Sequence, residues 1–225
     1  MNIRQPLFRG NMKYNYCIWD FNGTILDDVE LGIYAINELF KAHKMDRCLE
    51  REEYCLKFDF PIKDYYQRVG FDFEKTPYEV LAPEWVDIYF SNFDKARLFP
   101  DVISTLSFLR QMGMRQCVLS ASEQNSLKKQ IDDFGIKHYF EEIMGIGNIY
   151  AASKLELAKK WRERHPEDRV MFIGDTTHDI ETAKALSADC YIICAGHQSR
   201  ERFKDCNDVT VLSSLTELCE LLKAL

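Results

Sequence analysis

The chain has 225 residues, of which 46% are hydrophobic and 29% are charged, and its formal net charge is -7. This composition is typical of one large globular domain, or of a core with a smaller insert, and excludes disordered and fibrous proteins. The negative charge argues against nucleic-acid and membrane partners, because both present anionic surfaces. With no apolar run of spanning length and no apolar segment at the N-terminus, we expect a cytoplasmic protein.

Eight cysteines lie at positions 17, 48, 55, 117, 190, 194, 206 and 219, and none forms a C-x-x-C pair. Cys17, Cys117 and Cys194 fall in apolar runs of strand length, where a free cysteine packs as a small hydrophobic side chain. For a cytosolic chain we therefore expect reduced thiols rather than a disulfide framework or a zinc site.

Short apolar runs alternate with longer amphipathic segments. The runs predict strands over residues 16–19, 116–119, 170–173, 191–194 and 209–212. Apolar residues at spacings of three and four predict helices over 101–112, 122–134, 153–164 and 179–187. This alternation, with strands that are apolar on both faces, predicts an α/β fold with a doubly wound, mostly parallel sheet.

Capping residues support the predicted helices. Asp101 begins a helix that Gly113 ends, and Ser122 precedes a helix that Gly135 ends. Ser153 begins the next helix. The amphipathic segments therefore have the start and stop signals that helices need.

The pattern changes between residues 30 and 95, where aromatic residues are frequent and no strand is indicated. Residues 29–43, 51–58 and 77–93 predict helices. We therefore expect an all-helical insert over 31–94, and an α/β core formed by 1–30 and 95–225.

Polar residues follow or lie near the ends of the predicted strands. Asp20 follows the first strand, Ser120 the second and Asp175 the third, while Lys154 opens the helix that leads to the third strand. Taken singly, these residues have ordinary roles in turns and helix caps or on a solvated helix, as does Asp179 in a first helical turn. Because ligands bind beyond the carboxyl ends of strands in such sheets, we expect them to form one site.

The residue types in this set indicate a particular chemistry. Asp20, Asp175 and Asp179 would repel one another without a cation, and hard oxygen ligands with water suit Mg²⁺. Ser120 and backbone N–H groups at a helix N-terminus can hold phosphate oxygens, and Lys154 adds a positive charge. The set therefore predicts Mg²⁺-dependent phosphoryl transfer.

Four motifs resemble those of the haloacid dehalogenase superfamily, in order and spacing. They are D-F-N-G-T at 20–24, L-S-A-S at 119–122, S-K at 153–154 and G-D-T-T-H-D at 174–179. The helical insert corresponds to the C1-type cap of phosphoglycolate phosphatase-like members. The resemblance covers nearly the whole chain apart from the first dozen residues.

The resemblance implies a phosphohydrolase for a small phosphorylated metabolite, in which Asp20 is the nucleophile and forms an aspartyl-phosphate. It implies Mg²⁺ as the cofactor, bound by Asp20, the backbone carbonyl of Asn22 and Asp175. Asp179 would complete the acidic group as a metal ligand, through water, or as the partner of Lys154.

Further roles follow from the resemblance. Thr24, Ser120 and the amide of Ala121 would position the nucleophile and the phosphate, and the cap would select the substrate. His178 and His197 fall in predicted loops, and His197 is the one that could touch a substrate. Aromatic residues of the insert at helical spacing favour cap core over a ring-stacking pocket; they are Tyr65, Tyr66, Phe71, Phe73, Tyr78 and Trp85.

Asn22 departs from the family pattern, in which a second Asp protonates the leaving group and then activates water. The contact through the backbone carbonyl survives the change, but the proton shuttle does not. Because such proton transfer contributes about 10²- to 10⁴-fold, we expect weak turnover of alkyl phosphates. Acyl and aryl phosphates, whose leaving groups need no proton, should react better. Asn22-Gly23 is also prone to deamidation, which would generate the missing Asp.

Three alternatives remain open. The chain could be a phosphate-binding or partner-binding member of the same fold with negligible turnover. A receiver-type phosphoacceptor also uses Asp, Ser or Thr, and Lys, but is much shorter and has no helical insert. A phosphonate-cleaving branch uses a cap lysine, and the lysines available here, all among polar residues, are Lys41, Lys44, Lys57, Lys63 and Lys75. The sequence indicates no oligomeric state.

Overall fold

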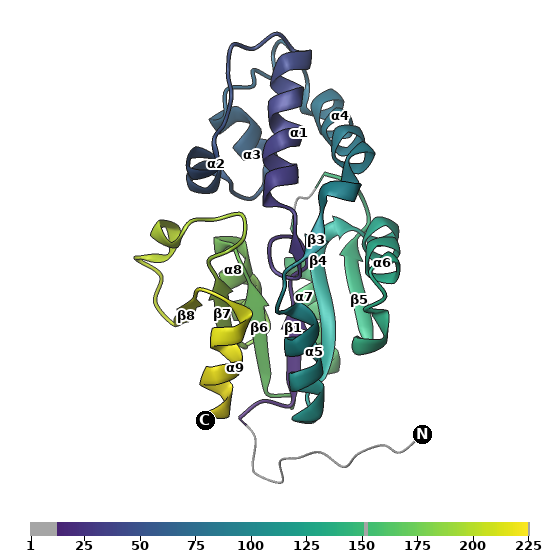
Figure 1. Cartoon of the computed structure of the whole chain (residues 1–225), viewed down its shortest axis with the longest axis vertical. Helices are drawn as coiled ribbons and strands as arrows, with labels where there is room; N and C mark the ends of the chain where they lie inside the picture. Colours follow the sequence, from purple (N-terminus) through teal and green to yellow (C-terminus); the bar gives the residue numbers. More distant parts are fainter. Residues whose placement is uncertain (1–12, 151–152, 225) are drawn as a thin grey trace.

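A parallel sheet forms the centre of the molecule (Figure 1). The computed structural model describes residues 13–150 and 153–224. In this part of the chain the sheet has six strands in the order β5-β4-β1-β6-β7-β8, and each neighbouring pair is parallel. The strands are β1 (Tyr16–Trp19), β4 (Arg115–Glu123), β5 (Glu142–Ile146), β6 (Val170–Gly174), β7 (Asp189–Ile193) and β8 (Val209–Leu212). The predicted fold class is confirmed.

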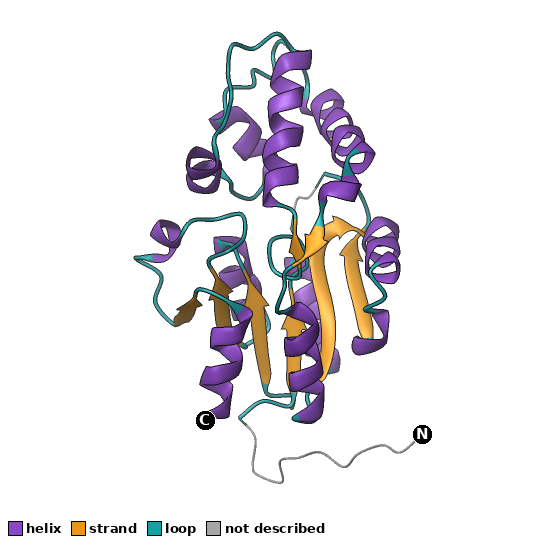
Figure 2. Ribbon diagram, in the orientation of Figure 1, coloured by secondary structure: helices purple, strands orange, loops and turns teal. Residues whose placement is uncertain are grey.

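Helices cover both faces of this sheet (Figure 2). Along β1 the side chains alternate, so that Cys17 and Trp19 lie in one apolar layer and Tyr16 and Ile18 in the other. The first layer is completed by α5 (Val102–Gln111), α6 (Gln124–Asp133) and α9 (Leu215–Lys223). The second is completed by α7 (Leu155–Arg164) and α8 (Thr177–Ala185). Burial on both faces explains why β1 is a continuous apolar run.

Most predicted strands and helices are present, with shifts at their ends. Strands 16–19 and 209–212 have the predicted bounds, whereas β4 runs on to Glu123 and β7 begins at Asp189. Strand β5 and helix α9 were not predicted. Strand β5 lies at the edge of the sheet, and its first two residues are only half-buried, so its sequence lacks the apolar run of a central strand.

Three predicted helix starts are corrected by the structure, and the first is that of α7, whose N-cap is Lys154 rather than Ser153. Glu123, not Ser122, caps α6, because its carboxylate accepts hydrogen bonds from the backbone N–H groups of Asn125 and Ser126 at 2.9 and 2.8 Å. Helix α8 begins at Thr177 rather than at residue 179, since residue 176 caps it.

The helical insert comprises residues 29–91 and stands over one end of the sheet (Figures 1 and 2). Its helices are α1 (Val29–Ala42), α2 (Arg51–Lys57), α3 (Ile62–Arg68) and α4 (Tyr78–Ser91), of which α3 was not predicted. They pack around an apolar cluster of their own. The antiparallel pair β2 (Leu26–Asp27) and β3 (Arg97–Leu98) carries the chain into and out of the insert. The domain boundaries at 30 and 95 stay a prediction.

The eight cysteines all lie in the described residues and form no disulfide. Cys17 and Cys117 are buried in strands, as expected, while Cys194 lies just beyond the end of β7. Among the described helices, none has the length and apolar character needed to cross a membrane.

Candidate active site

The strand order brings the predicted site residues together. Strand β1 lies between β4 and β6, so the residues that follow these strands meet at one edge of the sheet, beneath the insert (Figure 1). Asp20 follows β1, Asp175 follows β6 and Ser120 lies in the last part of β4. All three side chains are buried. The expectation of one shared site at the carboxyl ends of the strands is therefore met.

Asp20, Asp175 and Asp179 form a buried acidic cluster. Their carboxylate oxygens lie within 4.8 Å of one another. Burial raises the pKa of Asp175 well above its ordinary value, and the carboxylates of Asp179 and Asp20 raise it further. Because a cation would relieve this repulsion, the donor set fits a hard divalent ion such as Mg²⁺.

Lys154 binds two of these carboxylates. Its ammonium group pairs with Asp20 and lies 2.7 Å from Asp179, and its side chain is 2% exposed. Burial alone would lower the pKa of Lys154, but Asp179 and Asp20 outweigh that effect and raise it. Lys154 is therefore held as a cation beside Asp20, and it stands at the N-cap of α7, where the sequence placed it.

Asp179 has protein partners on both carboxylate oxygens. One oxygen accepts hydrogen bonds from the backbone of Asp175 and from the backbone and hydroxyl of Thr176, at 2.7 to 3.0 Å. The other lies 2.7 Å from the Lys154 ammonium. Of the three roles that the sequence left open for Asp179, the structure favours that of partner to Lys154.

Thr24 lies against Asp175. Its hydroxyl is fully buried and donates to Oδ1 of Asp175 at 3.0 Å. The turn that follows β1 folds back through hydrogen bonds from the N–H groups of Ile25 and Leu26 to the carbonyl of Phe21, which carries Thr24 inward. Thr24 therefore orients Asp175, and its role in positioning the nucleophile and the phosphate stays a prediction.

The end of β4 provides polar groups on the other side of Asp20. The register between β4 and β5 shifts between Leu119 and Glu123, so the intervening residues Ser120 and Ala121 leave the regular ladder. Both line the cavity described below. The amides at the start of α6 are taken by Glu123, so they are not available to a phosphate, contrary to the expectation of a helix N-terminal anion site.

Asn22 is fixed by a network that the sequence did not reveal. Its amide donates to Oδ2 of Asp28 at 2.8 Å, and its Oδ1 accepts from the hydroxyl of Ser122 at 2.7 Å. Tyr89 of α4 donates to the same carboxylate oxygen of Asp28 at 2.7 Å. The Asn22 side chain therefore has partners for both its donor and its acceptor.

A buried His197–Asp28 pair stands behind Asn22. Nε2 of His197 lies 3.2 Å from Oδ1 of Asp28, and its Nδ1 lies 2.9 Å from the hydroxyl of Tyr54. Burial would raise the pKa of Asp28, but His197 outweighs this and lowers it, while Asp28 raises the pKa of His197. The backbone N–H of His197 also donates to Asp175 at 2.7 Å. Only the G-H pair at 196–197 hinted at this position in the sequence.

His178, by contrast, has a structural role. Its ring stacks on Phe60 of the insert with centroids 4.9 Å apart, and burial lowers its pKa. Its Nε2 lies 3.5 Å from the backbone N–H of Lys154. It lies at the start of α8 rather than in the predicted loop.

Glycines leave the space that Asp175 occupies. A Cβ at Gly196 would lie 2.2 Å from Oδ2 of Asp175 and 2.4 Å from the carbonyl oxygen of Gly23. A Cβ at Gly23, where φ is +71°, would lie 2.2 Å from the same carboxylate oxygen. The Asp175 side chain therefore fits only because Gly23 and Gly196 have no Cβ atom.

Gly196→Ala is therefore expected to displace Asp175 and weaken Mg²⁺ binding by about 10- to 100-fold, as loss of a supporting contact does at metal sites. Isothermal titration of the protein with Mg²⁺ measures this. Gly147→Ala is the matched control, because a Cβ there meets no atom within 4 Å. Equal affinities in the two variants would show that Asp175 takes no part in binding the ion.

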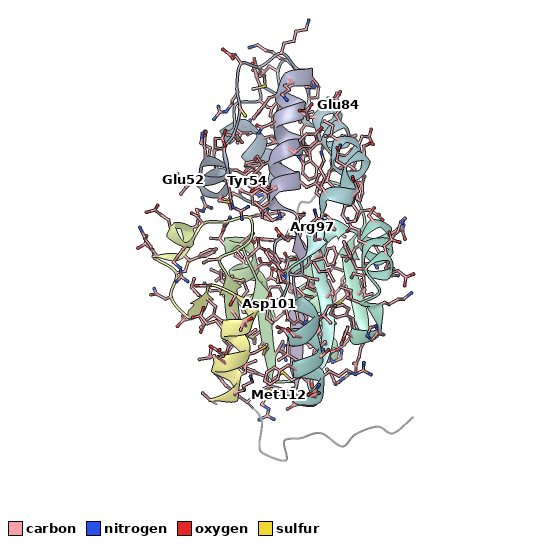
Figure 3. The ribbon with its side chains drawn as sticks, viewed as in Figure 1. Glu52, Tyr54, Glu84, Arg97, Asp101 and Met112 are labelled. Carbon is pink, nitrogen blue, oxygen red and sulfur yellow. The ribbon has the colours of Figure 1, made fainter. Side chains whose placement is uncertain are left out.

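A cavity of about 170 Å³ extends from Asp20 into the insert. Figure 3 shows Tyr54 at the base of the insert, on the side of the sheet. Phe58 of the insert stacks on His197 of the core, with centroids 4.8 Å apart. The aromatic residues that line the cavity are Tyr54, Phe58, Phe60, Tyr65, Tyr66, Tyr78, Trp85, Tyr89 and Phe90.

The predicted role of the insert aromatics is right only in part. Phe71 and Phe73 pack in the apolar cluster of the insert and do not line the cavity. Tyr65, Tyr66, Tyr78 and Trp85 both pack there and line the cavity. Sequence spacing cannot separate these roles, because one ring can do both.

The five insert lysines considered in the sequence do not line the cavity. Two of them form short ion pairs within helices, Lys41 with Glu38 and Lys57 with Glu53, each at 2.6 Å. The structure therefore gives no support to a lysine-dependent phosphonate-cleaving site.

Comparison with known proteins agrees with this arrangement. The family model of haloacid dehalogenase-like hydrolases matches residues 17–193. A phosphoglycolate phosphatase of Pseudomonas syringae pv. tomato is 22% identical over 233 residues, covering 97% of this chain and 83% of its own.

Solved structures share the fold at low sequence identity. The structure of protein tyrosine kinase A of Mycobacterium tuberculosis matches with a TM-score of 0.78 and 20% identity, over 95% of this chain and 99% of that one. A structure described as a predicted phosphoglycolate phosphatase from Haemophilus somnus matches with a TM-score of 0.74 and 16% identity, over 94% and 99%. Because the family model spans well over half of the sequence and its motifs meet in one site, this chain belongs to the haloacid dehalogenase-like hydrolases.

Proposed function

We propose that this chain is a Mg²⁺-dependent phosphohydrolase that acts on a small phosphate ester through a phospho-aspartate on Asp20. The observation that carries the proposal is the buried cluster in which Lys154 pairs with Asp20 and Asp179, beside Asp175. Stability alone does not favour such a cluster, since burying more negative than positive charge costs free energy. The phosphatase named among the relatives supports a phosphate ester as substrate.

The acidic cluster carries more negative charge than Lys154 can neutralise. Mg²⁺ held by Asp20, the backbone carbonyl of Asn22 and Asp175 would supply the missing positive charge and neutralise a bound phosphoryl group. Asp179, which has protein partners on both oxygens, would hold Lys154 in place and contact the ion only through water.

The proposed reaction has two steps. A carboxylate oxygen of Asp20 attacks phosphorus, and the bond to the leaving oxygen breaks, with its electron pair staying on that oxygen. Water then attacks the phosphoryl group on Asp20, which releases inorganic phosphate and restores the carboxylate. Lys154 orients Asp20, and the Ser120 hydroxyl and the Ala121 amide, whose residues line the cavity, would donate to phosphoryl oxygens.

Asn22 limits the choice of leaving group. Its amide holds no acidic proton, and both ends of its side chain are bound to Asp28 and Ser122. An ester whose leaving oxygen is stable as an anion avoids the missing proton transfer, which is typically worth about 10²- to 10⁴-fold. The same feature supports a second candidate, a phosphate-binding or partner-binding member of the family with little turnover.

Hydrolysis of 4-nitrophenyl phosphate tests the proposal. We expect phosphate release in the presence of Mg²⁺, loss of activity with EDTA and recovery when Mg²⁺ is restored. Activity that persists in EDTA would contradict the metal dependence. Absence of turnover of both 4-nitrophenyl phosphate and acetyl phosphate, together with calorimetric binding of inorganic phosphate, would favour the second candidate.

A further inference from the structure

Among its described lining residues, the cavity above Asp20 has no lysine or arginine. The ionisable groups among these residues, other than tyrosines, are Asp20, Asp28, Glu123 and His197. His197 is already paired with Asp28. A substrate whose leaving group carries a carboxylate, such as phosphoglycolate, would bury that charge against carboxylates without a partner.

Besides Lys154, which pairs with Asp20 and Asp179, two cations near the cavity are engaged elsewhere. Lys63 lies 5.7 Å from the ring of Tyr78, which lines the cavity, but its ammonium faces Glu79 at 3.8 Å. Arg202 of the core is bound at 2.7 Å to Asp59, which stands between Phe58 and Phe60 in the sequence. Neither side chain is part of the lining. Neither of these two cations therefore belongs to the wall that would surround the leaving group.

The walls of the cavity suit a flat apolar ring instead. Trp85 and Tyr89 of α4 stack with centroids 5.0 Å apart, and seven further lining residues are phenylalanine or tyrosine. The cavity volume of about 170 Å³ is close to the roughly 150 Å³ in which an apolar cavity binds benzene. A leaving group of about the size of one aromatic ring therefore fits beside the position proposed for the phosphoryl group.

Two buried polar atoms in the lining residues lack partners. The hydroxyl of Tyr65 and Oε1 of Gln130 form no hydrogen bond within the described part of the chain. Both residues line the cavity and are at most 4% exposed. Because buried polar groups are nearly always hydrogen-bonded, these atoms indicate a ligand with uncharged polar groups of its own.

As an extension of the proposed function, on which it rests, we propose that the substrate is the monophosphate of a neutral phenol with about one ring. The ring lies between α4 and the rings of α2 and α3, and the phosphoryl group lies against Asp20. A phenolic leaving group is consistent with the absence of a general acid at Asn22. A phenol has a pKa of about 10, as in tyrosine, so it can leave as an anion without a donated proton. Two independent features, the uncharged aromatic wall and the missing acid, thus select the same class.

Calorimetry with two non-hydrolysable ligands tests this independently of turnover. Benzylphosphonate and phosphonoacetate carry the same phosphonate group on a CH₂ and differ in bearing a ring or a carboxylate. In the presence of Mg²⁺ we expect benzylphosphonate to bind at least about 10-fold more tightly, since a buried ring gains from leaving water. Equal affinities, tighter binding of phosphonoacetate, or no binding of benzylphosphonate would overturn the proposal.

A matched pair of variants on α4 sharpens the test. Val86 lines the cavity, whereas Val80 is 45% exposed and does not. Val86→Lys is expected to reverse the preference toward phosphonoacetate, and Val80→Lys to leave it unchanged. An unchanged preference in Val86→Lys, or the same change in both variants, would show that the cavity wall does not select the ligand. A retained preference for benzylphosphonate without hydrolysis of 4-nitrophenyl phosphate would reject the phosphohydrolase function alone.

Discussion

Asp20→Asn is expected to lower the Mg²⁺-dependent hydrolysis of 4-nitrophenyl phosphate by at least about 10³-fold, because an amide cannot form the phospho-aspartate. The side chain keeps its shape, and Lys154 keeps its ion pair with Asp179 at 2.7 Å, so the fold should persist. Steady-state rates measure the loss, and a thermal unfolding curve reports whether the variant is folded.

Asp94→Asn provides the control for this experiment, since Asp94 is exposed and lies outside the site. It should retain the activity of the original protein. A tenfold loss of activity corresponds to a rise of only about 1.4 kcal/mol in the activation free energy. If a folded Asp20→Asn variant retained more than about a tenth of the activity, the nucleophile would have to be another group.

Exchanging the side chains of Asn22 and Asp28 is expected to raise hydrolysis of benzyl phosphate by about 10²-fold or more, because it restores an acid at position 22. The contact between these side chains explains why both must change. The Asn22 amide donates to the Asp28 carboxylate at 2.8 Å, so Asn22→Asp alone sets two carboxylates against each other in a buried place. Asn22→Asp with Asp28→Asn restores one donor and one acceptor.

The single variants are the controls for the exchange. Asn22→Asp alone should be less stable than the double variant by about 1 to 3 kcal/mol, the usual effect of a buried polar group left unpaired. Urea unfolding measures the difference in the free energy of unfolding. If Asn22→Asp is as stable as the double variant, or if the exchange leaves benzyl phosphate hydrolysis unchanged, the contact does not limit proton transfer.

The local pattern of the sequence predicts much of the fold and part of the site. Strand β1 is apolar on both faces because helices cover both sides, and this makes it visible as a run that ends at Asp20. Lys154 and Asp175 are marked by the elements they begin or follow, so their meeting follows from the geometry of a parallel sheet. Strand β5 was not predicted because it lies at the edge of the sheet, where a strand can be less uniformly apolar than a central strand.

Hydrogen-bond partners distant in sequence could not be predicted in this way. Thr24 donates to Asp175 across 151 positions of the chain, and His197 contacts Asp28 across 169. Whether a hydroxyl in a turn faces a phosphate or a carboxylate depends on which strand lies next to it. That neighbour is set by the packing of the whole sheet.

The sequence by itself determined the class of fold, the order of the motifs and the identity of the candidate nucleophile, because these depend on local periodicity and on residues that follow strands. Only the tertiary structure decided that Asn22 is bound to Asp28, and that the aromatic residues of the insert line a cavity whose described wall holds no lysine or arginine. The physical reason is that a cavity and a buried hydrogen bond are formed by side chains from segments that are distant in the sequence. The local sequence of one segment does not show which other segment it will contact.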